Sequence, residues 1–170
     1  AKPCGGEWDV LLGPVYAGDV LVSSGGATVL INPHTGLAAR RILVPGENPV
    51  RFQAGAGDLG IFVHADGDLT GASLRTGECR FTRRSPLKGA TWVCVESDVL
   101  FAGEKGGRVT AYSLKEDTKV WETMLQGEYP AASAGSDGRL FLGSAAGSIV
   151  CLDVRTGQPA WKATVEGAVT

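Results

Sequence analysis

The chain has 170 residues, of which 25 are glycine, and a formal net charge of −2 at pH 7. This length suffices for one domain with a sizeable core. The near-neutral charge excludes the broad basic surface of a nucleic-acid-binding protein. Since no apolar run approaches the roughly twenty residues that cross a bilayer, no membrane span is expected.

Short apolar runs alternate with turns along the whole chain, and the turns recur at a constant spacing. The first turn of each recurring segment contains a glycine, namely Gly26, Gly67, Gly107 or Gly147. A second turn follows ten residues later, at Gly36, Gly77, Asp117 and Gly157. Runs of this length between glycine turns predict antiparallel strands joined by hairpins, because tight turns need the positive φ that glycine adopts freely.

The period near forty residues divides the chain into four repeats, each with four expected strands. Residues 1–14 form a lead-in and a strand, Trp8–Leu12, that resembles the last strand of a repeat. Residues 168–170 look like the start of a further repeat. The expected repeats cover residues 15–44, 50–83, 90–125 and 131–165.

Several strands per forty-residue repeat are typical of a β-propeller blade, which buries its faces against neighbouring blades. We therefore predict an all-β propeller with four four-stranded antiparallel blades. These form either half of an eight-bladed ring or a small four-bladed propeller. As half a ring, the end blades would expose apolar faces, such as the one carrying Val150 and Leu152, and a second four-blade segment or copy would complete the ring.

Residues 147–161, GSIVCLDVRTGQPAW, resemble the pyrroloquinoline-quinone-like (BamB-like) propeller repeat, whose pattern is roughly AxDxxTGxxxW. The third repeat matches over residues 108–121, and the second has Phe81 in place of the tryptophan. The resemblance implies that Trp121 and Trp161 are buried between adjacent blades. Arg40 stands at the equivalent place in the first repeat and is expected to be partly exposed.

The family includes quinone-dependent dehydrogenases and non-catalytic assembly factors, so the resemblance leaves two functions open. The dehydrogenases use adjacent cysteines and acidic calcium ligands, whereas Cys4, Cys79, Cys94 and Cys151 are scattered here. Our first hypothesis is a non-catalytic protein-interaction or scaffold module without a cofactor or metal. The alternative is a fragment of a quinone-dependent oxidoreductase.

Two local patterns have both a chemical and a structural interpretation. Asp66-Gly67-Asp68 begins like a calcium loop, but Gly77 stands where a bidentate glutamate is required, so an ordinary turn is favoured. His34 and His64 occupy different places in the repeat and have no paired nucleophile, which favours polar structural roles.

The expected interaction surface is the face that carries the loops within and between repeats. Strand alternation places the turn between the second and third strands on the same face as the connection to the next repeat. Mixed charge with an aromatic residue suits a polar protein interface. The candidate binding residues are Arg83, Arg84, Lys88, Lys105 and Tyr129, accompanied on this face by Glu47, Asn48, Glu104 and Glu128.

Overall fold

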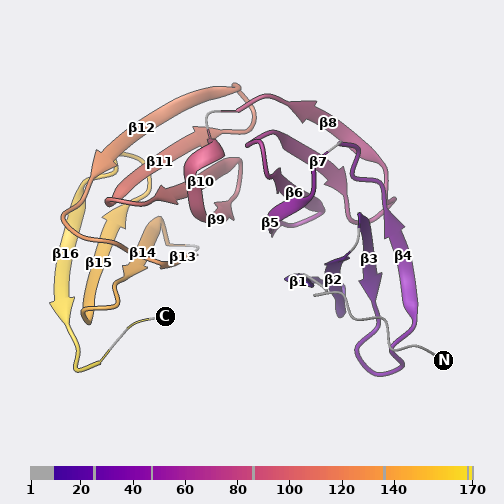
Figure 1. Ribbon diagram of the computed structural model, residues 1–170, viewed down its shortest axis with the longest axis horizontal. Helices are drawn as coiled ribbons and strands as arrows, with labels where there is room; N and C mark the ends of the chain where they lie inside the picture. Colours follow the sequence, from indigo (N-terminus) through magenta and orange to yellow (C-terminus); the bar gives the residue numbers. More distant parts are fainter. Residues whose placement is uncertain are drawn as a thin grey trace. The chain divides into compact units, whose positions relative to one another are not determined.

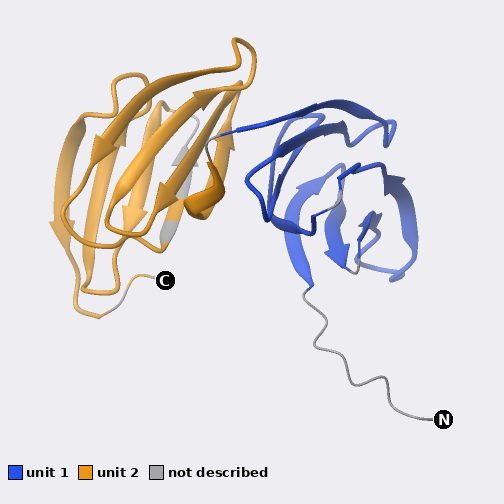
Figure 2. Cartoon of the chain, turned by 45° about the horizontal axis from the view of Figure 1, so that its top comes forward, with its two compact units in different colours: residues 1–85 blue, residues 86–170 orange. Residues whose placement is uncertain are grey.

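The computed structural model of the protein describes residues 10–24, 26–46, 48–85, 87–135, 137–167 and 169. Sixteen strands occupy these ranges (Figure 1), and the one helical segment described is the short 3₁₀ turn Leu87–Gly89. No helix in the described ranges has the length and apolar character needed to cross a membrane. The chain divides into two compact units, residues 1–85 and 86–170 (Figure 2).

Each unit contains two four-stranded antiparallel sheets, in which the strands follow one another in chain order. We call these sheets blades one to four. Blade one contains β1 (Leu11–Tyr16), β2 (Asp19–Ser24), β3 (Ala27–Ile31) and β4 (Ala38–Ile42), and blade two contains β5 (Val50–Ala56), β6 (Leu59–His64), β7 (Leu69–Ser73) and β8 (Cys79–Arg83). Blade three contains β9 (Ala90–Glu96), β10 (Val99–Glu104), β11 (Arg108–Ser113) and β12 (Thr118–Met124), and blade four contains β13 (Ala131–Gly135), β14 (Arg139–Gly143), β15 (Ser148–Asp153) and β16 (Pro159–Thr164). The expected all-β fold of four four-stranded blades is confirmed.

The start of blade one differs from the expectation. Leu11 and Leu12 were assigned to the last strand of a preceding repeat, but they begin β1 and pair with Ser23 and Val22 of β2. The pairing has an irregularity between Leu12 and Val15, next to Gly13 and Pro14, which hid the strand from a search for regular alternation. Trp8 and residue 168 lie outside the described residues.

The glycine of each β2–β3-type turn has the positive φ that its place in the repeat predicts. The φ angles are 79° at Gly26, 94° at Gly67, 87° at Gly107 and 80° at Gly147. At Gly107 and Gly147 a Cβ atom would also lie only 2.3 Å and 2.2 Å from the carbonyl oxygen of Leu125 or Val165, the residue that follows the outer strand. These two positions therefore exclude a side chain as well as requiring the left-handed backbone.

The second turn of each blade is closed by a polar side chain at its first position. In blade four, Asp153 Oδ1 accepts hydrogen bonds from the backbone N–H groups of Arg155 and Thr156, and the N–H of Gly157 donates to the Asp153 carbonyl. Blade three has Asp117 at the glycine position with a φ of 58°, where its carboxylate accepts a hydrogen bond from the Tyr112 hydroxyl. Asp is one of the few residues that tolerate this backbone region, which explains the exception.

Each outer strand has a β-bulge just before the residue that aligns with the family tryptophan. The register shifts between Leu30 and Ile31, Gly71 and Ala72, Ala111 and Tyr112, and Cys151 and Leu152 of the neighbouring strand. Such a bulge bends the strand and redirects the following side chain. Arg40, Phe81, Trp121 and Trp161 thus occupy one structural position in four blades.

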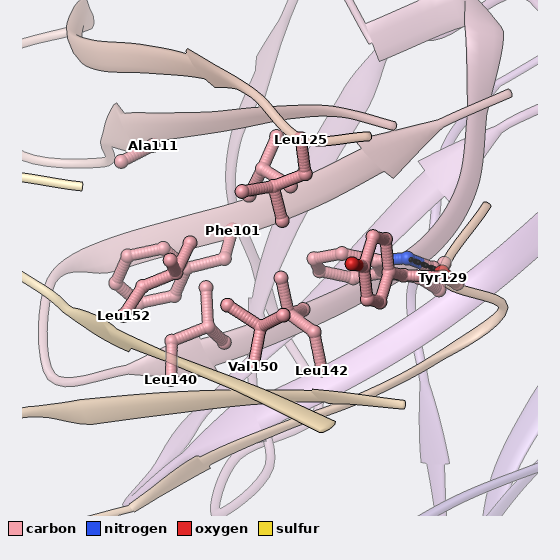
Figure 3. Packing of buried hydrophobic residues seen from close by; sticks show 10 residues of the cluster. Phe101, Ala111, Leu125, Tyr129, Leu140, Leu142, Val150 and Leu152 are labelled. Atoms are coloured by element: carbon pink, nitrogen blue, oxygen red, sulfur yellow. Dashed lines mark hydrogen bonds between the residues drawn. The ribbon is translucent and has the colours of Figure 1, made fainter. Parts of the chain in front are cut away.

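In each unit the core lies between the two blades. In unit 1, Leu21, Leu30 and Ile42 of blade one pack with Phe62, Ala72 and Leu74 of blade two. In unit 2, Phe101 and Leu125 from the third-blade side face Leu140, Val150 and Leu152 of blade four (Figure 3). Val150 and Leu152 are therefore buried, and the prediction that their face of blade four is exposed was wrong.

Candidate interaction face

The loops of unit 1 meet at one end of blade two, as the strand alternation predicts. Asn48, in the link from blade one, donates a side-chain hydrogen bond of 2.6 Å to Asp66 in the β6–β7 turn. Ser85, which follows β8, donates a 2.6 Å hydrogen bond to the carbonyl of Gly67 in the same turn. These contacts join the link and the turn into one loop face.

A small cleft of about 240 Å³ opens on this loop face. Most of its lining residues are polar, and they carry charges of both signs. The lining residues are Pro45, Gly46, Asn48, His64, Asp66, Asp68, Thr82 and Arg84. Arg84 is the one candidate binding residue of the sequence analysis that lines this cleft.

His64 forms the floor of the cleft and is only 4% exposed. Its Nδ1 lies 2.8 Å from the carbonyl oxygen of Asn48, and its Nε2 lies 2.9 Å from the hydroxyl oxygen of Thr70. The Thr70 hydroxyl donates in turn to the carbonyl of Pro45 at 3.1 Å. Because both ring nitrogens are engaged, His64 fastens the inter-blade link to blade two and fits a structural role.

Asp66 supplies a carboxylate at the rim of the cleft. The backbone N–H of Asp68 donates to it, and this hydrogen bond, with that from Asn48, lowers the pKa of Asp66 despite an opposing effect of burial. Asp66 Oδ1 accepts the Asp68 N–H within the turn, and Oδ2 accepts the Asn48 side chain from the inter-blade link. The rim therefore keeps a negative charge at neutral pH.

A second cleft, of about 760 Å³, shares Gly46, Asn48 and His64 with the first. It lies against β1–β3 and β5 and has a mixed polar and apolar lining. Gln53 crosses between the two blades here, accepting a 2.8 Å hydrogen bond from the Ser23 hydroxyl and donating one of 2.7 Å to the Leu11 carbonyl. Gln53 could not be predicted from the sequence, because no motif marks a glutamine whose partners are 30 and 42 residues away.

The other candidate binding residues have different environments. The guanidinium of Arg83 stacks over the Phe81 ring at 4.3 Å from its centroid, within unit 1. Lys88 on the 3₁₀ turn and Lys105 after β10 are exposed and belong to unit 2. Glu47, expected on the same face, lies outside the described residues.

Tyr129 lies in the connection that follows β12, but its side chain is buried and not exposed on the loop face as predicted. It is 6% exposed and belongs to the unit 2 core, where its carbonyl accepts a 2.6 Å hydrogen bond from Trp92 Nε1. Its hydroxyl donates to the Gln126 carbonyl at 3.2 Å. A tyrosine in a Gly- and Pro-flanked loop appears exposed in the sequence, but here its ring closes the end of the core.

Within each unit, the outer strand of one blade contacts the second turn of the next blade. Trp121 Nε1 donates a 2.8 Å hydrogen bond to the carbonyl of Val154, and the indole lies against Gly157, where a Cβ atom would be 2.6 Å from a ring carbon. Thr123 adds a 2.9 Å hydrogen bond to the Gly157 carbonyl. Trp121 is partly buried and packs on the unit 2 core, so it docks β12 on the second turn of blade four.

Arg40 makes the corresponding contact in unit 1. Its guanidinium donates to the carbonyl of Leu74 at 3.3 Å, and Leu74 precedes Gly77 by three residues, as Val154 precedes Gly157. The backbone N–H of Leu43 donates to the Gly77 carbonyl at 2.7 Å. Arg40 is exposed, as expected, yet it keeps the donor function of the tryptophan that it replaces.

Trp161 differs from Trp121 although both share one place in the repeat. Its side chain is 46% exposed, so the prediction that it is buried between blades was wrong for the described structure. It contacts Phe141 of its own blade, with ring centroids 6.0 Å apart. The two tryptophans thus occupy the same position in the repeat, but only Trp121 lies against the second turn of a neighbouring blade.

Asp58, between β5 and β6, joins that hairpin to the second turn of blade two. Burial opposes its ionisation, but hydrogen bonds from the Arg75 N–H and the Ser73 and Tyr16 hydroxyls, with the charge of Arg80, lower the pKa of Asp58 below its usual value. A carboxyl with a lowered folded pKa stabilises the fold above its unfolded pKa of about 4, and this stabilisation is lost as the pH falls through the folded value.

Asp58→Asn is therefore expected to destabilise unit 1 near neutral pH and to have a progressively smaller effect as the pH falls below about 4. Urea titrations of the native chain and the variant between pH 7 and pH 2.5, followed by hydrogen exchange in β6 and β7, measure the difference. A difference that is constant with pH would show that the charge of Asp58 contributes nothing.

Comparison with known proteins agrees with this fold. Residues 105–170 match the family model described as outer membrane protein assembly factor BamB. No curated protein matches the chain by sequence.

Solved structures resemble nearly the whole chain. BamB from Moraxella catarrhalis is 18% identical with a TM-score of 0.70, over 94% of this chain and 49% of that one. The computationally designed protein Ika8 is also 18% identical, with a TM-score of 0.71, over 95% of this chain and 51% of that one. A chain of the mitotic checkpoint complex is 15% identical with a TM-score of 0.72, over 93% of this chain and 52% of that one.

The chain spans about half the length of these structures, and their low identity bears on the fold alone. The family match covers β11, β12 and the whole of blade four, where the repeat pattern is clearest. Together with the four blades, this match confirms the resemblance that the sequence indicated: the chain has the β-propeller fold, and its residues 105–170 are similar to the BamB family.

Proposed function

We propose that the chain is a non-catalytic protein-interaction module that uses its loop face. The observation that supports this most is the small polar cleft of unit 1, where Asp66, Asp68 and Arg84 present charges of both signs on a buried histidine floor. Side chains held by hydrogen bonds at a loop face suit recognition of a polar protein segment, because little side-chain entropy is lost on binding.

The comparisons support a scaffold function in general terms. One matched structure is named for an assembly factor family and another is part of a protein complex. Blades of this kind host many functions, so the partner has to be inferred from the surface and not from the fold. No observation in the described residues favours the quinone-dependent oxidoreductase, and we propose only the interaction module.

The charge-reversed variants Arg84→Glu and Asp68→Lys are expected to lose at least about tenfold of the binding of a protein partner, since charged rim contacts set specificity and association rate. The immobilised chain is incubated with cell lysate, and retained proteins are quantified by mass spectrometry. Lys119→Glu on the outer strand β12 is the matched control and should retain the same proteins as the native chain.

A partner retained equally by all four chains would contradict recognition through the cleft. Folding of each variant is checked by its thermal midpoint, because Arg84 and Asp68 lie at the surface and should change stability little. Loss of binding without loss of stability identifies the loop face as the binding surface.

We further propose that a second four-blade segment or copy completes a larger propeller ring with this chain. Each matched solved structure is about twice as long as the stretch that this chain covers. The loop-face partner and the ring-completing partner would use different surfaces.

A further inference from the structure

Blade four carries an apolar face that the described residues of unit 2 leave largely open, with only Val169 lying against it, at Gly143. Cys151 pairs with Phe141 and Trp161 across the sheet, so these side chains share the face opposite to the buried Leu140 and Leu152. Trp161 is nearly half exposed, and Phe141 and Ile149 are partly exposed. The corresponding face of blade three, with Phe101 and Trp121, is the one that packs on a neighbouring blade.

The second turn of blade one, Asn32–Gly36, has the same structure as the Asp153–Gly157 turn of blade four, against which Trp121 packs. Asn32 Oδ1 accepts the N–H groups of His34 at 3.0 Å and Thr35 at 3.1 Å, and the Gly36 N–H donates to the Asn32 carbonyl at 2.9 Å. In the Asp153–Gly157 turn the equivalent distances are 3.0, 3.1 and 2.9 Å. The two turns therefore present the same backbone groups.

The Asn32–Gly36 turn and the Asp153–Gly157 turn differ in whether a side chain packs against the glycine. Gly36 has a φ of 69°, close to the 70° of Gly157, but an added Cβ atom would meet nothing within 4 Å. At Gly157 the same atom would meet Trp121. The docking position on the blade one turn is thus formed, and no described residue of unit 1 occupies it.

The sheet beside this turn is apolar and open. Leu12 is 74% exposed and Val15 is 66% exposed, and both are on β1. Their pairing with Val22 and Val20 places them on the face opposite to the buried Leu21. Exposed apolar side chains on this face can pack against the open face of a further blade.

We propose that Trp161 of one copy of this chain docks on the Asn32–Gly36 turn of a second copy. The indole lies on Gly36, its Nε1–H donates to the Pro33 carbonyl, and Phe141 and Ile149 pack against the open face of blade one. The contact is made twice in a dimer, because each copy supplies one tryptophan and one turn. This rests on the proposed completion of a ring and is independent of recognition through the cleft.

The structure supports a second copy best as the binding partner, because this chain carries both groups of the contact, Trp161 and the Asn32–Gly36 turn. The contact already exists inside unit 2 between Trp121 and the Asp153–Gly157 turn. Arg40 and the Gly77 turn repeat it in unit 1. The acceptor carbonyl stands three residues before the glycine in both cases, as Pro33 stands before Gly36.

Sedimentation equilibrium of the full chain tests the proposal. The native chain should be dimeric at micromolar concentration, and Trp161→Ala should weaken the dimer at least about 30-fold, as expected for a central aromatic contact. Val15→Arg, which leaves Trp161 intact and blocks the open face of blade one, should have the same effect. Val120→Ala is the control, since Val120 is 48% exposed on another outer strand and should leave the dimer unchanged.

A mixture of the two weakened variants gives a sharper result. Trp161→Ala keeps the turn and Val15→Arg keeps the tryptophan, so the mixture should form a heterodimer through one intact contact. This heterodimer should be tighter than the homodimer of either variant, because neither homodimer has an intact contact. A native chain that remains monomeric overturns the proposal. This holds both when Trp161 stays exposed in the monomer and when it is covered by residues of its own chain. A dimer that survives both substitutions, or a mixture that stays monomeric, overturns it as well.

Discussion

Trp121→Ala is expected to lower the free energy of unfolding of unit 2 by about 3 kcal/mol, at the lower end of the range for large core aromatics because the side chain is only partly buried. The substitution removes the packing of the indole on Phe101, with centroids 5.8 Å apart, and the hydrogen bond to Val154. It also uncovers Gly157, so two blades lose their main contact at the outer edge. Chemical denaturation followed by hydrogen exchange in β12 and β15 measures the loss.

Trp161→Ala is the matched control for Trp121→Ala, because the two tryptophans occupy one place in the repeat. Its expected cost is about 1 kcal/mol when measured at a concentration too low for association, since nearly half of the side chain is already in water. Equal losses for the two variants would mean that the contact with the Asp153–Gly157 turn adds no stability beyond the contacts within one blade.

The fold could be predicted from the sequence because the repeat determines it locally. The turn glycines and the short apolar runs each specify a hairpin, and four copies of one pattern specify four blades. The start of blade one was missed because Gly13 and Pro14 interrupt the alternation of β1. Local irregularity of this kind removes the signal without removing the strand.

The sequence predicted the position of a side chain in the repeat, but its burial also depends on whether a second blade packs against it. The repeat alignment placed Trp121 and Trp161 at one position, and the structure confirms that position through their shared β-bulge. Burial depends on a second blade, and only Trp121 has one among the described residues. Choosing Val150 and Leu152 for the open face failed for a related reason, because strand alternation identifies two faces but does not say which one meets the preceding blade.

Contacts between distant residues were the least predictable part of the site. His64 and Gln53 join blades one and two through hydrogen bonds to backbone carbonyls, and no spacing in the sequence marks such partners. Arg40 was recognisable as a substitution for the aromatic residue, but its hydrogen bond to Leu74 required the structure. Charged loop residues, by contrast, could be assigned to the surface, and Arg84, Lys88 and Lys105 are exposed.

Gly157→Ala is expected to destabilise unit 2 by about 3 kcal/mol, whereas Gly36→Ala should cost only about 1 kcal/mol in the monomer. Both glycines have nearly the same positive φ, 70° and 69°, so both alanines carry the same backbone strain. Only at Gly157 would the new methyl group lie 2.6 Å from the Trp121 ring and 2.8 Å from the Thr123 hydroxyl oxygen. The difference between the two variants therefore isolates the contact between blades from the strain of the turn.

A double-mutant cycle distinguishes this explanation from a general weakness of unit 2. In the Trp121→Ala background the clash with the indole is absent, while the strain of the left-handed backbone and the close approach to the Thr123 hydroxyl remain. Gly157→Ala should therefore cost clearly less than the roughly 3 kcal/mol that it costs beside the indole. Urea denaturation of the native chain, both single variants and the double variant provides the four free energies. If Gly157→Ala costs as much without Trp121 as with it, the indole does not rest on this turn, and the proposed docking of Trp161 on Gly36 loses its structural precedent.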